Sequence, residues 1–116
     1  MNPKITLALT SLLLLTACGA STTIEKAANA MAETACLHFN EGLSREELEA
    51  QSLAILEKYT YATAAEIDGY LLSIQGTEEL NAIASTLRDA LKSNCGGTLE
   101  AKGVAAEDLA NAMVSE

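Results

Sequence analysis

The chain has 116 residues, enough for a single domain, and carries 16 acidic against 7 basic residues, a formal charge of −9. This acidic balance argues against nucleic acid as a partner and against adsorption to anionic lipid headgroups, because both attract basic surfaces. Apolar residues make up 49% of the sequence, and alanine supplies much of that fraction. The only proline is Pro3, and no alternating apolar pattern is present, so the composition indicates an all-α protein.

The N-terminal segment has the layout of a secretory signal. Lys4 gives a positive start, and residues 5–15 form a mostly apolar run that is too short to span a bilayer. The run ends in Leu15-Thr16-Ala17-Cys18, which resembles the lipobox of bacterial lipoproteins. The resemblance implies a signal peptide over residues 1–17, cut before Cys18, with a diacylglyceryl group on the Cys18 sulfur and an acyl chain such as palmitate on its amine. The alternative is an ordinary signal with a chance cysteine, cut after Ala20.

Residues 18–22 would then be the lipidated cysteine and a short tether, and residues 23–116 the helical domain. Several acyl chains make a stable membrane anchor. Gly19, rather than aspartate, follows the cysteine. By resemblance to the enterobacterial sorting pattern, this favours the outer membrane, facing the periplasm, if the host is Gram-negative. Removing residues 1–17 takes away Lys4 and leaves 99 residues with a formal charge of −10.

Capping signatures divide the domain into four main helices. Boxes at Thr22–Glu25, Ser44–Glu47 and Thr63–Glu66 open the first three, and Thr77 opens the fourth. The apolar spacing predicts that these helices end near Phe39, Tyr59, Gly76 and Cys95. Gly96-Gly97 is expected to end the fourth helix in a left-handed conformation. A weaker fifth helix is expected after Gly103. The acidic residues cluster in the first turns of helices, where the helix dipole favours negative charge. This position explains their number without a carboxylate active site.

The cysteine count predicts one disulfide. With Cys18 lipidated, Cys36 and Cys95 are left in an oxidising compartment, where thiols of small exported domains tend to pair. In an up-down-up-down bundle their helix ends would lie about 25 Å apart, whereas a disulfide needs Cα atoms within about 7 Å. We therefore expect an all-α fold that is a compact, irregular array of four main helices with crossed axes, plus the weaker C-terminal helix.

His38, the only histidine, offers an alternative function. Together with Cys36 and Cys95 it could form a metal carrier or a small enzyme site if both thiols stayed reduced. Otherwise it packs in the last turn of the first helix. No serine motif or glycine-rich phosphate loop accompanies it, so we expect no cofactor and no enzymatic activity. Gly69 costs its helix about 1 kcal/mol relative to alanine, and we expect a neighbouring backbone to pack closely there, beside Tyr70.

Three motifs together carry a family resemblance. The chain resembles HdeA-type small periplasmic helical proteins and Tai-type immunity proteins at three places. These are Cys36-Leu37-His38-Phe39, Asp68-Gly69-Tyr70-Leu71, and Cys95 followed by a final helix. Those families have an early C-x-x-F, a mid-domain G-Y, one bridging disulfide and a helix after the second cysteine. This chain departs from them in having a lipobox and no proline after its second cysteine.

The resemblance implies family-like packing roles for Phe39, Gly69 and Tyr70. It also implies a non-enzymatic function in protein binding, either as an immunity protein that plugs a delivered toxin or as a stress-related chaperone. The acidic domain suits a basic protein partner, since opposite charges speed the encounter of two proteins. The sequence therefore predicts a membrane-anchored, periplasm-facing binding protein.

Overall fold

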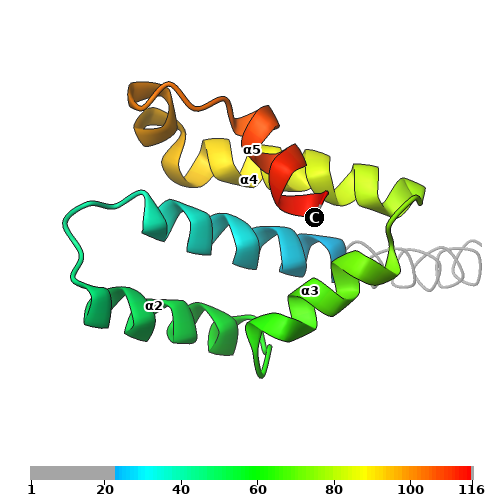
Figure 1. Cartoon of the computed structure of the whole chain (residues 1–116), viewed down its shortest axis with the longest axis horizontal. Coiled ribbons are helices and arrows are strands. Elements are labelled where there is room, and N and C mark those ends of the chain that lie inside the picture. Colours follow the sequence, from blue (N-terminus) through cyan, green and yellow to red (C-terminus); the bar gives the residue numbers. More distant parts are fainter. Residues whose placement is uncertain (1–22, 116) are drawn as a thin grey trace, which may run out of the picture.

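A computed structural model describes residues 23–115, and within that range it contains five helices and no strand (Figure 1). The first helix covers residues 23–38. It is followed by α2 (Arg45–Lys58), α3 (Ala64–Ser73), α4 (Glu78–Ala101) and α5 (Ala106–Val114). The prediction of an all-α fold with four main helices and a C-terminal one is confirmed. The predicted signal peptide with its lipobox, Cys18 and the whole predicted tether lie outside the described residues. None of the described helices has both the length and the apolar content needed to cross a membrane.

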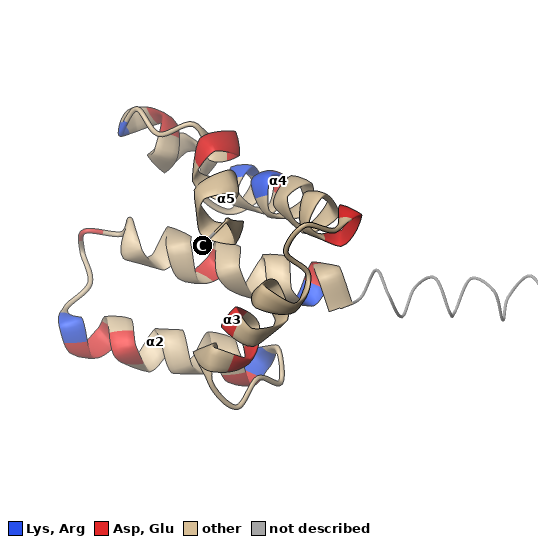
Figure 2. Ribbon diagram, turned by 45° about the vertical axis from the view of Figure 1, so that its right-hand side comes forward, with Lys and Arg blue, Asp and Glu red and all other residues tan. Residues whose placement is uncertain are grey.

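The first helix lies in the middle of the domain, with α2 antiparallel on one side and α4 on the other (Figures 1 and 2). The short α3 crosses the end of the domain at which the first helix begins. As a result α4 starts from that same end and runs in the same direction as the first helix. This course brings Cys36 and Cys95 together in a disulfide, with 5.7 Å between their Cα atoms. The predicted bond and the irregular array are both confirmed.

Alanine in the first helix lets its neighbours approach closely. Ala27, Ala28, Ala30 and Ala32 have no exposed surface, so this helix is covered on more than one face. The long side chains of the core come mainly from α4. The largest fully buried side chains, Ile83, Leu87, Leu91 and Leu99, all belong to this helix.

The predicted helix starts agree with the structure, but only one of the three described caps forms as expected. The Oγ of Ser44 accepts a hydrogen bond from the backbone N–H of Glu47 at 3.2 Å. Thr63 and Thr77 occupy N-cap positions without a side-chain cap bond. The hydroxyl of Thr77 instead donates to the carbonyl of Ile74 at 2.6 Å.

The predicted helix stop at Gly96-Gly97 is wrong. α4 continues to Ala101, and it is interrupted one residue earlier, where Cys95 has the non-helical angles φ −148° and ψ 33°. Neither glycine adopts a positive φ. The last turns of α4 persist because Leu99, only 1% exposed, anchors them in the core. The helix is therefore broken at the disulfide and then resumes.

The actual left-handed stop is Gly103, with φ +71°. Its N–H donates to the carbonyl of Glu100 at 3.0 Å, and the N–H of Val104 donates to the carbonyl of Leu99 at 2.9 Å. These two bonds satisfy carbonyls that have no partner within the helix, as in a Schellman motif. Only glycine adopts this backbone conformation without a steric penalty.

The predicted packing role of Gly69 is also wrong. Gly69 is exposed, and a Cβ placed there would meet no neighbouring atom within 4 Å. The buried side chains of α3 are Ile67 and Leu71. Because each residue turns the helix by about 100°, a position two residues from both of them faces away from the core.

Gly69→Ala should therefore stabilise the protein, raising the free energy of unfolding by about 1 kcal/mol, because alanine is the better helix former. Gly103→Ala is the matched control, since the same added methyl at φ +71° should lower the free energy of unfolding by about 1 kcal/mol. Denaturant unfolding of the oxidised protein measures both changes. A Gly69→Ala variant that unfolds at lower denaturant than the wild type would contradict the exposed position of this residue.

Candidate functional site

α2 is the least buried of the described helices, because none of its residues is fully buried. Its sequence explains why. The polar Ser52 interrupts the apolar residues of its inward face, and the neighbouring Gln51 and Ala54 are exposed. The inward side chains are only half-buried: Leu48, Ser52, Ile55, Leu56 and Tyr59. A cleft opens along each side of this helix.

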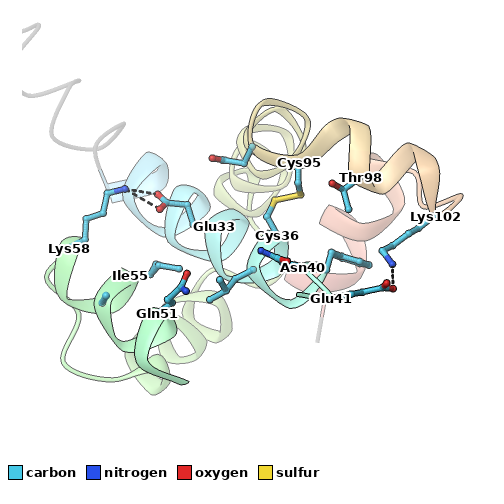
Figure 3. A pocket seen from close by; sticks show the side chains of 14 residues that line it. Glu33, Cys36, Asn40, Glu41, Gln51, Ile55, Lys58, Cys95, Thr98 and Lys102 are labelled. Atoms are coloured by element: carbon cyan, nitrogen blue, oxygen red, sulfur yellow. Dashed lines mark hydrogen bonds and ion pairs between the residues drawn. A yellow bond between two sulfur atoms is a disulfide. The ribbon is translucent and has the colours of Figure 1, made fainter. Parts of the chain in front are cut away.

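The first cleft, named here the disulfide cleft, lies between the first helix, α2 and the second half of α4 (Figure 3). Its volume is about 820 Å³. The half-buried Cys36–Cys95 bond forms part of its wall. Its lining mixes apolar side chains with amides, among them Phe39, Ile55, Asn40, Gln51 and Asn94. This mixture can contact both the apolar side chains and the backbone of a bound polypeptide.

Glu33 closes one end of the disulfide cleft. The ammonium of Lys58 lies 3.0 and 3.1 Å from its two carboxylate oxygens, and the hydroxyl of Tyr59 also donates to it. The hydrogen bond to Glu33 raises the pKa of Lys58 above its usual value. Burial, followed by the bond to Glu33, raises the pKa of Tyr59. These contacts fasten the C-terminal end of α2 to the first helix.

The turn after α2 adds a second contact to the first helix. Thr60 has φ +60°, a left-handed conformation that is unfavourable for a β-branched residue. The turn is closed by the N–H of Tyr61, which donates to the carbonyl of Leu56 at 2.8 Å. The ring of Tyr61 then lies 4.4 Å from the ammonium of Lys26, within the range of a cation–π interaction. The sharp reversal thus places the tyrosines on both sides of Thr60 against the first helix.

An ion pair between Glu41 and Lys102 closes the other end of the disulfide cleft (Figure 3). It joins the loop after the first helix to the residue that follows α4. The hydrogen bond from Lys102, and then its charge, lower the pKa of Glu41. Because Glu41 is exposed, we expect this pair to position the loop rather than to stabilise the fold appreciably.

The second cleft, named here the apolar cleft, lies between the first helix, α2, α3 and α5 and has a volume of about 520 Å³. Most of its wall is apolar, and the polar contributions come from Thr34, His38, Ser52 and Asp68. The side chain of Phe39 lines both clefts and separates them. The apolar part of the wall consists of Met31, Ala35, Phe39, Leu56, Ala64, Ile67, Leu71, Leu109 and Met113.

The remaining residues of the family-like motifs have different surroundings. Phe39 and Tyr70 are both half-buried and pack against the core. The hydroxyl of Tyr70 donates to Glu79 and so ties α3 to the first turn of α4. Burial and then this bond raise the pKa of Tyr70. Gly69 takes part in neither cleft.

The structure does not assemble the alternative metal or enzyme site. Both sulfurs of Cys36 and Cys95 are consumed by the disulfide, so neither is a free thiolate ligand. His38 is exposed and lines the apolar cleft, on the other side of Phe39 from the disulfide. Over residues 23–115, no three side chains of the histidine, cysteine or acidic types are grouped so as to hold a metal ion.

The sequence does not predict the two clefts or the contacts of Glu33 with Lys58 and Tyr59. A signal for Glu33 was present, because it is the only acidic residue between Glu25 and Glu41. The interrupted apolar face of α2 was a weaker signal. Its consequence depends on how far α2 lies from the first helix, and local sequence does not specify that distance.

Compared with known proteins, the chain matches no family model, and no curated protein or solved structure is significantly similar to it. Its function is therefore inferred from the two clefts, the charge and the lipobox.

Stability should fall in alkaline solution. Burial and acidic neighbours raise the pKa of Tyr59, Tyr61 and Tyr70 in the folded chain, whereas unfolded tyrosines ionise near pH 10. Above about pH 10 the unfolded state therefore binds fewer protons than the folded state, and the free energy of unfolding decreases as the pH rises. Denaturant unfolding between about pH 8 and pH 11 measures this decrease. It should be shallower in Tyr59→Phe, and a wild-type stability that stays constant above about pH 10 would contradict the assignment.

Proposed function

We propose that this chain is a lipid-anchored protein of the cell envelope, and that its helical domain acts by binding another protein rather than as an enzyme. One observation carries the binding role: α2 has no fully buried residue and has an open cleft along each side. A surface helix of a small domain ordinarily buries its apolar stripe in the core. Half-buried apolar side chains beside open clefts are instead typical of binding surfaces.

A protein fits this surface better than a small molecule does. The two clefts lie on both flanks of one helix, so a single large partner can contact α2 from either side. A large apolar side chain of α2 adds to the accessible surface, since Leu53 is 65% exposed. The excess of acidic residues favours a basic partner, because complementary charge speeds encounter and disfavours wrong partners.

The lipobox supports the location. If Cys18 carries the lipid, about five residues separate the bilayer from the first described helix, a reach of roughly 17 Å. The domain would then work at the surface of its own membrane, on a partner that arrives there or is embedded nearby. In a Gram-negative host, the residue after the cysteine favours the periplasmic face of the outer membrane.

The resemblance to HdeA-type and Tai-type proteins supports two forms of this function. In an immunity-like form, the domain would bind a toxin delivered into the envelope. In a chaperone-like form, it would bind envelope proteins under stress. Both forms rely on protein binding and neither needs a cofactor, so the same experiment serves for both.

Site-specific photo-crosslinking in cells tests the binding role. A photoreactive residue replaces Gln51, which lines the disulfide cleft, or Leu53, which lies on the other flank of α2, at native expression. We expect a discrete adduct from at least one of these positions, with a partner identified by mass spectrometry. Ser93 is the control, because it is exposed on α4 and lines neither cleft, and it should give no adduct.

Repeating the experiment with Cys18→Ser tests the anchor. This variant should leave the membrane fraction, lack the mass of the lipid and give less adduct, because the partner is met at the membrane surface. Absence of adducts from both α2 positions, or equal adducts from Ser93, would reject the binding role. A Cys18→Ser protein that stays in the membrane fraction would reject the anchor.

A further inference from the structure

The apolar cleft continues along α2 into a second hollow of about 440 Å³, and the two share His38 and Ser52. The second hollow is lined by Leu48 and by the exposed Leu53. Together the apolar cleft and this hollow are named here the apolar groove. Along α2 its apolar side chains extend from Leu48 to Leu56, a rise of about 12 Å, and Arg45 lines the end of the hollow before Leu48.

The shape and chemistry of the apolar groove suit a helix. Anchor side chains at positions i, i+4 and i+7 of a helix span about 10.5 Å, close to the length of the groove along α2. The wall offers few partners to an extended backbone, and the hydroxyl of Thr34 already donates to the carbonyl of Ala30 at 2.8 Å. A helix satisfies its own backbone hydrogen bonds and needs no such partners. Met31 and Met113 supply adaptable apolar surface for its side chains.

The charge around the groove is strongly negative. Three of the four helices that wall it, α2, α3 and α5, carry eight acidic residues, all exposed, and two basic ones (Figure 2). Each base already faces an acid: Arg45 lies 4.0 Å from Glu49, and Lys58 lies 3.0 Å from Glu33. Two acids and one base line the groove itself: Glu49 and Arg45 face each other in the hollow, and Asp68 lies in the apolar cleft. The lining of the disulfide cleft is balanced in charge, because Glu33 pairs with Lys58 and Glu41 pairs with Lys102.

We propose that the apolar groove binds a basic amphipathic helix of the protein partner, which places leucine-like anchors between α2, α3 and α5 and lysine or arginine beside Glu49 and Asp68. The inference rests on the protein-binding role proposed above and names the site and the chemistry of the partner. A second copy of this chain is a poor occupant, because its own helices are acidic and like charges oppose association.

A synthetic leucine/lysine amphipathic helix of about 18 residues, roughly 27 Å long, is the probe. Its binding to the full-length protein in zwitterionic micelles is followed by fluorescence anisotropy, against protein-free micelles. A leucine/glutamate helix with the same apolar face is the charge control. The key variants are Leu53→Lys in the groove and Leu72→Lys outside it, which make the same change at equally exposed leucines. Asp68→Asn and Glu100→Gln form a second pair, with Asp68 in the groove and Glu100 exposed on α4.

We expect the leucine/lysine helix to bind, Leu53→Lys to weaken binding about tenfold, and Leu72→Lys to change it by less than about twofold. Asp68→Asn should weaken binding more than Glu100→Gln, and the leucine/glutamate helix should not bind. Equal effects of the two leucine variants would show attraction by overall charge alone and overturn the proposal. So would equal binding of the acidic helix, no binding of the basic helix, or self-association that Leu53→Lys abolishes.

The two proposals fail separately. A native partner that crosslinks through Gln51 in the disulfide cleft, combined with no binding of the basic helix, would keep the protein-binding role and reject the groove as its site. Binding of the basic helix without any native adduct at either position on α2 would leave the groove chemistry in place and reject the proposed function.

Discussion

The Cys36–Cys95 disulfide is the constraint on which the arrangement of the helices depends. The two cysteines are 59 positions apart, and the loop between them contains α2, α3 and most of α4. Cross-linking a loop of this length removes unfolded-state entropy worth roughly 4 kcal/mol, a large share of the about 5–15 kcal/mol that stabilises a typical domain. The bond can form because α3 crosses the end of the domain instead of returning along the first helix. α4 then runs parallel to the first helix, and the two cysteines meet.

Within that closed loop, α2 is held mainly at its C-terminal end and little by the core. At its C-terminal end, Lys58 and Tyr59 bind Glu33, and Tyr61 stacks under Lys26. Between the ends, its side chains are only half-buried and clefts lie on both sides. The disulfide and the alanine-rich packing therefore stabilise the body of the domain, while α2 keeps apolar surface accessible. This division of roles lets a partner contact α2 without disturbing the core.

The helices could be predicted because alanine content, capping residues and apolar spacing act locally. The disulfide could be predicted because the proposed lipidation of Cys18 leaves two cysteines. Glycine was the main source of error. The prediction for Gly69 is wrong because the sequence does not show which side of α3 faces solvent. The prediction for Gly96-Gly97 is wrong because the sequence does not show that a later leucine holds the last turns of α4. The clefts depend on the distance between α2 and the first helix. The partners of Glu33 are 25 and 26 positions away, so no local pattern revealed them.

The central claim is that α2 is a lightly held helix on a rigid, disulfide-closed body. Residue-resolved amide hydrogen exchange of the oxidised full-length protein tests it most directly, because protection reports the free energy of local opening. After correction for intrinsic rates, the account predicts that the central amides of α2 exchange at least about a hundredfold faster than those of residues 27–32 and 83–91, a difference of roughly 2.7 kcal/mol. Equal protection in α2 and in those two segments would contradict the claim.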